Sequence, residues 1–251
     1  MTATPAYAPS LEGNLRVGHV LSRAWDVFSA NFVKFVIITA IVTLPNTLLF
    51  VNTPEVSQGV PPDAGFFWRV FGGLVVAIFL NMLAQAVILY IAFQYLRGRL
   101  APLGDALQHG LSRLLPIIGV VVLSILGIWA GLLLLIVPGI MLALRWMVAM
   151  PVCVVERLGP VESLKRSAVL TKGYRWKIFG IFLLLWLINI ALGIVIKLFS
   201  YMVGPTATLV INFLWTAVWA AYFNSLWVMI YHDLRVAKEG VDTEQIASVF
   251  D

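Results

Sequence analysis

The sequence predicts an all-α integral membrane protein in which six transmembrane helices form three hairpins, each preceded by an amphipathic interfacial helix. Three observations predict this fold class: the composition, six long apolar runs, and short amphipathic segments that occur three times. Of the 251 residues, 61% are hydrophobic and 12% are charged, whereas a soluble domain has about 45–50% apolar and about 25% charged residues. So few charges cannot cover a soluble fold, disordered chains are polar, and a single cysteine, Cys153, excludes a disulfide scaffold.

Six continuous apolar stretches provide the predicted spans. A helix needs about 20 apolar residues to cross a hydrocarbon core of roughly 30 Å. Because the stretches are continuous, they favour helices over the alternating strands of a barrel. The fourth is the shortest and contains Arg145; it starts directly after Pro138 and Gly139, which we expect to make the tight turn before it. The approximate limits are 32–51, 67–90, 115–137, 140–155, 178–201 and 206–231.

The basic residues predict the orientation. With the N-terminus in the cytoplasm, 14 of the 17 lysines and arginines fall in cytoplasmic segments, Arg69 and Lys197 fall on the outer side, and Arg145 lies within a span. The positive-inside rule therefore predicts that both termini are cytoplasmic. The cytoplasmic set is Arg16, Arg23, Lys34, Arg97, Arg99, Arg113, Arg157, Lys165, Arg166, Lys172, Arg175, Lys177, Arg235 and Lys238.

Amphipathic segments precede the first, third and fifth spans. A unit of amphipathic helix, outward span and returning span thus begins near residues 16, 101 and 160. A helical period places apolar residues on one face of each segment and charged residues, such as Arg23, on another. Such helices lie in the membrane interface; the alternative is polar loops with chance periodicity. The predicted apolar faces are Val17, Leu21, Ala24 and Phe28; Leu103, Ala106, Leu107, Gly110, Leu111 and Leu114; and Val161, Leu164 and Ala168.

The three units form a single predicted membrane domain at residues 16–235. Residues 1–15 have neither the basic region nor the apolar core of a cleavable signal, and we expect a flexible N-terminal tail. Residues 236–251 are predicted to form a cytoplasmic C-terminal tail.

Arg145 is the most informative polar residue in a span. An arginine there costs several kcal/mol and usually pairs with protein or reaches water. We expect Arg145 near the outer end of its helix, either as a structural anchor or as a contact for a lipid phosphate or a substrate. The span amides are expected to form hydrogen bonds between helices, with a polar permeation path as the alternative. These amides are Asn81, Gln85, Gln94, Asn189, Asn212 and Asn224.

The sequence contains no motif of catalysis, nucleotide binding or metal binding. His19, His109 and His232 all fall on the predicted cytoplasmic side, where we expect solvated interfacial histidines rather than a zinc site. We therefore expect no enzyme, no cofactor and no metal. The basic residues lie beside the membrane, which favours anionic headgroups over nucleic acid as their partner. The candidate lipid-binding residues are Arg145, Arg157, Lys165, Arg166, Lys172, Arg175 and Lys177.

One stretch carries a family resemblance. Residues 138–151 read PGIMLALRWMVAMP, an acidic residue follows at Glu156, and residues 159–173 read GPVESLKRSAVLTKG. This pattern resembles the membrane domain of the glycerophosphoryl diester phosphodiesterase family and the related YciC-type bacterial inner-membrane proteins. The resemblance is tight over about 40 residues and loose over most of the chain. Its structural motif corresponds to Pro138, Gly139, Trp146, Pro151 and Glu156.

The resemblance implies a membrane module without the hydrolase. In fused family members a soluble phosphodiesterase domain carries catalysis, and a TIM barrel of about 250 residues has no room beside six spans. The leading hypothesis is a non-enzymatic module of the bacterial inner membrane that binds lipid or a partner protein, with a homo-oligomer possible. The alternative is a small transporter or channel that uses Arg145 and the amide-bearing spans.

Overall fold

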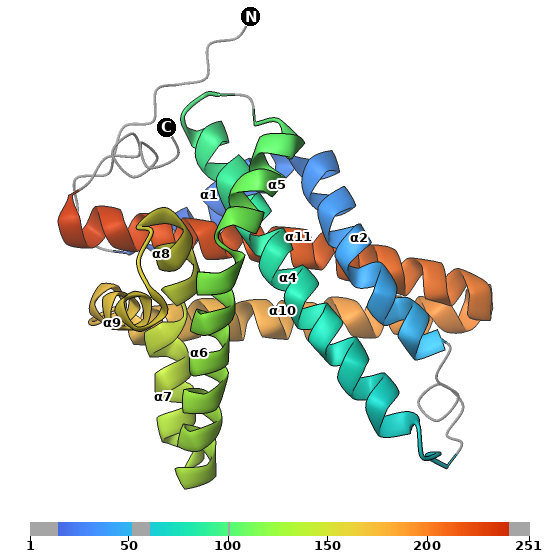
Figure 1. The fold of residues 1–251 in the computed structure, drawn as a ribbon. Helices are drawn as coiled ribbons and strands as arrows, with labels where there is room; N and C mark the ends of the chain where they lie inside the picture. The colour runs from blue at the N-terminus through green and yellow to red at the C-terminus, as the bar shows by residue number, and fades with distance from the viewer. Residues whose placement is uncertain (1–14, 52–60, 100, 241–251) are drawn as a thin grey trace, which may run out of the picture.

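The computed structural model describes residues 15–51, 61–99 and 101–240, and these residues form α-helices and no β-strand (Figure 1). The apolar runs and the amphipathic segments all form helices. The runs are long enough for membrane helices, and the amphipathic segments repeat their apolar residues with the helical period. The helices are α1 (Val17–Ala30), α2 (Phe32–Val51), α4 (Phe66–Leu96), α5 (Leu103–Ser112), α6 (Leu114–Leu134), α7 (Ile136–Trp146), α8 (Ala149–Val155), α9 (Pro160–Leu170), α10 (Arg175–Val203) and α11 (Pro205–Glu239).

Six candidate spans are long and apolar enough to cross a membrane, which confirms the predicted fold class. They are Phe32–Leu49, Phe66–Leu96, Leu114–Leu134, Ile136–Val155, Arg175–Ser200 and Pro205–Glu239. The fourth was predicted as one helix but consists of α7 and α8, separated at Met147 and Val148. The last continues to Glu239, so the predicted tail boundary at residue 236 falls inside a helix. Residues 241–251 of that tail, and all but the last residue of the predicted N-terminal tail, lie outside the described residues.

The residues directly before the three outward spans have nearly identical backbone conformations. Asn31 joins α1 to α2 with φ −116° and ψ 20°, and Arg113 joins α5 to α6 with φ −105° and ψ 4°. Tyr174, at the start of α10, has φ −112° and ψ −2°. The first two units thus share a one-residue bend, whereas in the third a four-residue turn that ends at Tyr174 includes Gly173, with φ +89°.

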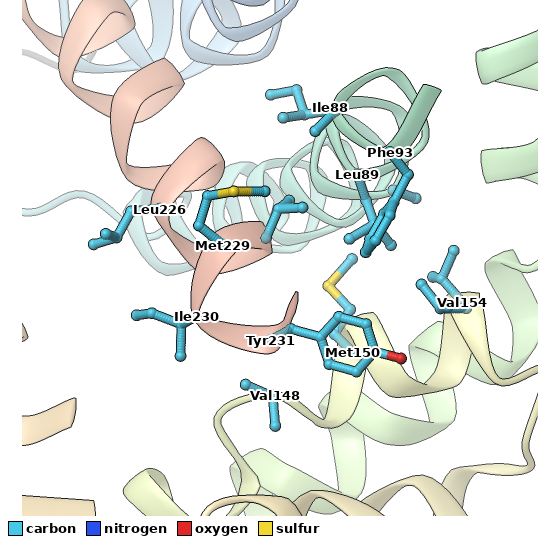
Figure 2. Packing of buried hydrophobic residues seen from close by; sticks show 14 of the residues in the cluster. Ile88, Leu89, Phe93, Val148, Met150, Val154, Leu226, Met229, Ile230 and Tyr231 are labelled. Atoms are coloured by element: carbon cyan, nitrogen blue, oxygen red, sulfur yellow. The ribbon is translucent and has the colours of Figure 1, made fainter. Parts of the chain in front are cut away.

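The packed core lies at one end of the molecule, where the amphipathic helices meet the ends of the spans. Ile88 and Phe93 of α4 pack there against Met150 and Val154 of α8 and the C-terminal half of α11 (Figure 2). From this packed end the hairpins α2–α4, α6–α7 and α10–α11 leave in different directions in Figure 1.

The hairpin tips expose apolar side chains. Trp68, Leu133 and Met202 lie near the tips of the three hairpins, and 76%, 83% and 83% of their surfaces are exposed. Large exposed apolar patches mark contact with a membrane or a partner. The exposed apolar side chains of the hairpins and the lengths of their helices therefore both indicate membrane spans.

Two glycines allow α6 and α7 to pack closely. A Cβ atom on Gly131 would lie 3.0 Å from the Cα of Gly139, and one on Gly139 would lie 2.9 Å from the backbone nitrogen of Leu132. Leu135, with φ −166° and ψ 151°, makes the turn between the helices. The prediction that Pro138 and Gly139 make this turn is therefore wrong: both lie at the start of α7, where a proline is tolerated because the first N–H groups of a helix have no acceptor within it.

The amphipathic helices bury faces that differ in part from the predicted ones. On α1, Arg23 is buried although it was assigned to the polar face. On α9, the small polar residues Ser163 and Ser167 are buried, whereas Val161 is half exposed. A close helix contact selects small side chains even when they are polar, which a pattern of hydrophobicity does not register.

Helix α5 buries only the small residues of its predicted apolar face, Ala106 and Gly110. Leu103, Leu107 and Leu111 share one side of this helix at a spacing of four residues and remain exposed. The protein therefore leaves a leucine stripe on α5 uncovered.

Candidate functional site

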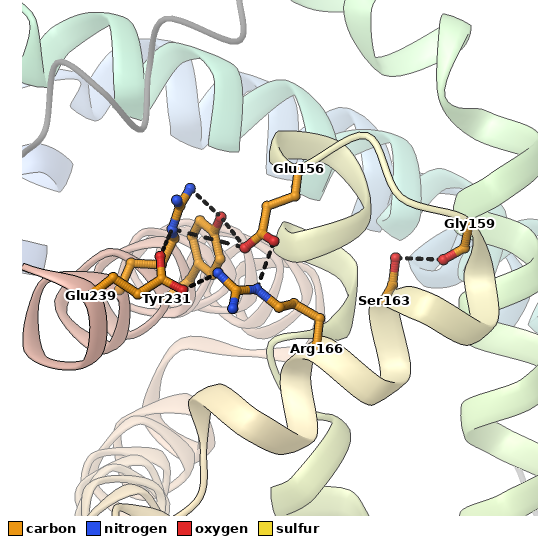
Figure 3. A network of polar contacts seen from close by, with 7 residues as sticks. Glu156, Gly159, Ser163, Arg166, Tyr231 and Glu239 are labelled. Carbon is orange, nitrogen blue, oxygen red and sulfur yellow. Dashed lines mark hydrogen bonds and ion pairs between the residues drawn. The ribbon is translucent and has the colours of Figure 1, made fainter. Parts of the chain in front are cut away.

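Ion pairs within the packed end use three carboxylates, those of Glu156, Asp233 and Glu239. Glu156, at the end of α8, accepts a hydrogen bond from the Nε of Arg166 at 2.7 Å, and Arg166 also pairs with Glu239 of α11 (Figure 3). Arg235 donates to Glu239 at 3.0 Å, and the Tyr231 hydroxyl donates to Glu156 at 3.3 Å. Partial burial would lower the pKa of Arg166, but its two carboxylate partners outweigh this effect and raise it above the usual value.

A second ion pair links the first described helix to the last. Arg23 donates to Asp233 at 2.6 Å, and its guanidinium lies 3.2 Å from the Nδ1 of His232. His232 is only 2% exposed, so the expectation of a solvated interfacial histidine is wrong for this residue. His19, on α1, lies 3.8 Å from Asp233.

Two part-buried backbone carbonyls at the C-terminal end of α7 receive side-chain hydrogen bonds. The Arg145 carbonyl accepts from Ser167 at 2.9 Å and from Thr171 at 3.2 Å. The Met147 carbonyl accepts from the indole of Trp227 at 2.7 Å. These bonds compensate the carbonyls that the break between α7 and α8 leaves without a helical partner.

The same contacts place Arg145 at a different end of its helix from the one expected. Its side chain is exposed, but it lies at the end of α7 next to α9 rather than near the hairpin tip. Helix α9 carries the exposed residues Glu162 and Lys165, and Lys172 follows it. Arg145 therefore belongs to the polar packed end, and the expectation that it lies near the outer end of its span is wrong.

Most residues of the resembling motif lie in contacts between helices. The Trp146 ring fills the space beside Gly127, where a Cβ atom would lie 2.3 Å from it. Pro151 is buried within α8, Gly139 packs on α6, and Glu156 binds Arg166. Pro138 is exposed at the start of α7. The motif residues thus contribute to the packing of α6 to α9.

The candidate basic residues divide into three groups. Arg166 serves in the ion pairs described above. Arg175 and Lys177 are half-buried, and they donate to the carbonyls of Ala168 and Leu15 at 3.4 Å each. The exposed group comprises Arg145, Arg157, Lys165 and Lys172. Of these, Arg145, Lys165 and Lys172 lie beside α9 and are here called the basic set.

Arg157 also lines a pocket that includes a residue absent from the candidates. Together with His109, Ser112 and Arg113 it surrounds a cavity of ≈ 280 Å³ between the α5–α6 joint and the end of α8. Arg113 was counted only as a cytoplasmic basic residue. Its place immediately before a span was visible in the sequence, but its proximity to Arg157 depends on how α8 packs against α6.

The span amides do not connect helices as expected. Asn81, Asn212 and Asn224 each donate to the carbonyl four residues earlier in their own helix, at 2.8–2.9 Å. Asn189 lines a pocket of ≈ 360 Å³ between α10 and α11, and the other lining residues are aromatic or aliphatic. The prediction of interhelical bonds is therefore wrong for the first three amides.

The described residues contain no group of three or more His, Cys, Asp or Glu side chains arranged to hold a metal ion. Fold and site together define a multi-pass α-helical membrane protein with a basic surface at its packed end. No protein-family model, curated protein or solved structure matches the chain.

Proposed function

We propose that the protein is a non-enzymatic module of the bacterial inner membrane that binds anionic lipid headgroups through the basic set. In this proposal both termini and the packed end face the cytoplasm, where anionic lipids attract basic residues by about 1 kcal/mol per residue. The resemblance stated above contributes the bacterial membrane and the absence of a hydrolase domain.

One observation carries the proposal: three carboxylates of the packed end are used in internal ion pairs, whereas three basic side chains beside α9 are exposed. Glu156, Asp233 and Glu239 bind arginines of the core. Arg145, Lys165 and Lys172 remain exposed beside α9, where Glu162 is the exposed acid. The three bases outnumber this acid, so the surface attracts anions.

The leucine stripe of α5 supports a position of the packed end at the membrane interface. An amphipathic helix at a membrane places its apolar side in the acyl boundary and its basic neighbours near the headgroups. Leu103, Leu107 and Leu111 provide this exposed apolar side, and the basic residues Arg99 and Arg113 lie before and after the helix.

Transport is the weaker alternative. A polar permeation path needs side chains that present polar groups to a continuous cavity, whereas three span amides bond to their own helices and the pocket at Asn189 is mostly apolar. We therefore do not propose transport.

A lipid-dependent stability measurement tests the proposal. Purified protein in a non-ionic detergent is heated with increasing amounts of phosphatidylglycerol or phosphatidylcholine. Phosphatidylglycerol is expected to raise the melting temperature more than phosphatidylcholine, and the Arg145→Gln, Lys165→Gln, Lys172→Gln triple variant should lose this difference. A matched control neutralises Arg69 and Lys197, which lie away from the packed end. An equal response of wild type and triple variant would refute the proposal.

The orientation has its own test. Cysteines introduced at Asp63 and Lys172 are labelled in intact cells with a membrane-impermeant maleimide, and the buried Cys153 provides the background. The Asp63→Cys variant should be labelled in intact cells and the Lys172→Cys variant only after the membrane is opened. Labelling of both in intact cells would contradict the orientation.

A further inference from the structure

Arg157 has a backbone conformation that glycine adopts in the other two units. It follows the last turns of α8 with φ +54° and is the one non-glycine residue with positive φ among the described residues. Gly98 follows α4 with φ +68°, and Gly240 follows α11 with φ +63°. A side chain is strained in this conformation, so the second unit carries a strained arginine where glycine would fit.

The side chain of Arg157 lies near a second arginine and a histidine. Arg113, half-buried at the α5–α6 joint, and His109 line the same pocket, and none of the lining residues among the described part of the chain is acidic. His109 is held by stacking on Tyr90, with ring centroids 4.7 Å apart, and by a hydrogen bond of its Nδ1 to the Asp105 carbonyl at 3.0 Å. Two arginines and an anchored histidine thus line one cavity.

The first unit has a pocket in the equivalent place. A cavity of ≈ 400 Å³ lies between the α1–α2 joint and the end of α4, and its lining includes Asn31 of the joint, Lys34, and Arg99 of the loop after α4. In both units the pocket lies between the joint into the outward span and the end of the returning span, and an arginine of the following loop lines it. The recurrence indicates that the repeat itself creates a pocket that basic residues line.

We propose that the pocket formed by His109, Arg113 and Arg157 binds the phosphate of an anionic ligand, either a lipid headgroup or a free phosphate. This rests on the proposed function and assigns it a specific site. Two guanidinium groups match phosphate oxygens through charge-assisted hydrogen bonds. Strained backbone conformations occur mainly at functional sites such as ligand clamps. Binding of a phosphate by the Arg157 guanidinium would explain why an arginine occupies this strained position.

Substitution of Arg157 by glycine provides a sharp test, because it removes the guanidinium and relieves the strained backbone together. The full chain in non-ionic detergent is titrated with dihexanoyl phosphatidic acid, inorganic phosphate and dihexanoyl phosphatidylcholine, and binding is followed by microscale thermophoresis. The Arg157→Gly and Arg113→Gln variants should each weaken the binding of the anionic probe by about tenfold or more. Arg157→Gly should melt, without ligand, at the temperature of the wild type or above it.

The probes identify the source of the phosphate, and the variants decide the proposal. Binding of phosphatidic acid alone indicates a lipid headgroup, and equal binding of inorganic phosphate indicates a free anion; either supports the site if Arg157→Gly weakens it. Lys197→Gln, away from the packed end, is the matched control and should bind as wild type does. Equal affinity of wild type, Arg157→Gly and Arg113→Gln, or no binding by the wild type, would overturn the site.

The outcome separates this site from the broader proposal. If neutralising Lys165 and Lys172 removes the preference for anionic lipid while Arg157→Gly does not, the basic set remains and the pocket fails. If only the Arg157 and Arg113 variants lose binding, the pocket remains and the basic set fails.

Discussion

Arg23 and Asp233 form an ion pair across 210 positions of the chain, with their nearest atoms 2.6 Å apart. The Arg23 side chain is 7% exposed and that of Asp233 is 11% exposed. The pair holds α1 against α11 inside the core, next to the buried His232. The first and last units of the repeat are thus joined by a bond that neither unit contains alone.

Loss of one partner should destabilise the protein strongly. Arg23→Met leaves Asp233 buried without its main partner, and the expected cost is about 3 kcal/mol, because a lone buried charge keeps its desolvation penalty. Unfolding in mixed detergent micelles measures the change. The Arg23→Met, Asp233→Leu double variant should recover much of it. Arg69→Gln, which removes the exposed pair with Asp63, is the control and should change stability little. Equal effects of Arg23→Met and Arg69→Gln would contradict this account.

The α6–α7 hairpin should tolerate no added methyl group at its crossing. Gly139→Ala places a Cβ against the backbone of Leu132, and Gly131→Ala places one against Gly139. We expect each to lower stability by about 1–3 kcal/mol, since overpacked backbones must move apart. Gly193→Ala in α10 meets nothing within 4 Å and should be neutral or stabilising. A stable Gly139→Ala variant would show that the helices are not in close contact.

Opposite substitutions at Gly98 and Arg157 should have opposite effects. Gly98→Ala forces a side chain into a left-handed conformation and should cost about 1 kcal/mol. Arg157→Gly relieves the same strain in the folded state, but glycine also raises the conformational entropy of the unfolded chain, which offsets part of the gain. The stability of this variant should therefore stay unchanged or rise by up to about 1 kcal/mol. Thermal unfolding without ligand measures both. A clear loss of stability in Arg157→Gly would mean that Arg157 is needed for folding.

The hydroxyls of α9 should stabilise the end of α7. The Ser167→Ala, Thr171→Val double variant removes both donors to the Arg145 carbonyl, and an unsatisfied buried carbonyl costs about 1–3 kcal/mol. Thr216→Val is the matched control, because Thr216 bonds only to a carbonyl of its own helix. Increased proteolysis between α7 and α9 in the double variant alone would support the contact, and identical proteolysis of both would argue against it.

The spans and the amphipathic helices were predictable because their signals are local. Each depends on the residues of one helix, and the period or the length of an apolar run records it. The turn at Leu135 was missed because it lies within a run of leucines, while the nearby Pro138 fits the start of a helix. The break at Met147 and Val148 was missed because neither residue is a glycine or proline, so no helix-breaking residue marks it in the sequence.

The site was only partly predictable because its contacts join distant residues. The basic surplus beside the membrane identified Arg157, but the partners that withdraw Arg166 from the surface lie on α8 and α11. The position of Arg145 at the packed end is apparent only from its contact with α9, where the hydroxyls of Ser167 and Thr171 donate to its carbonyl. Burial of Arg23 likewise requires Asp233, which no local pattern connects to it.

The central claim is that the basic set selects anionic lipid, and the most direct measurement is relative lipid affinity in a bilayer. Wild type and the Arg145→Gln, Lys165→Gln, Lys172→Gln variant are placed in vesicles that contain brominated phosphatidylglycerol or brominated phosphatidylcholine, and quenching of tryptophan fluorescence is recorded at low and high salt. The account predicts stronger quenching of the wild type by brominated phosphatidylglycerol, reduced by salt and absent in the variant. Quenching that is equal for the two lipids in the wild type, or unchanged in the variant, would contradict it.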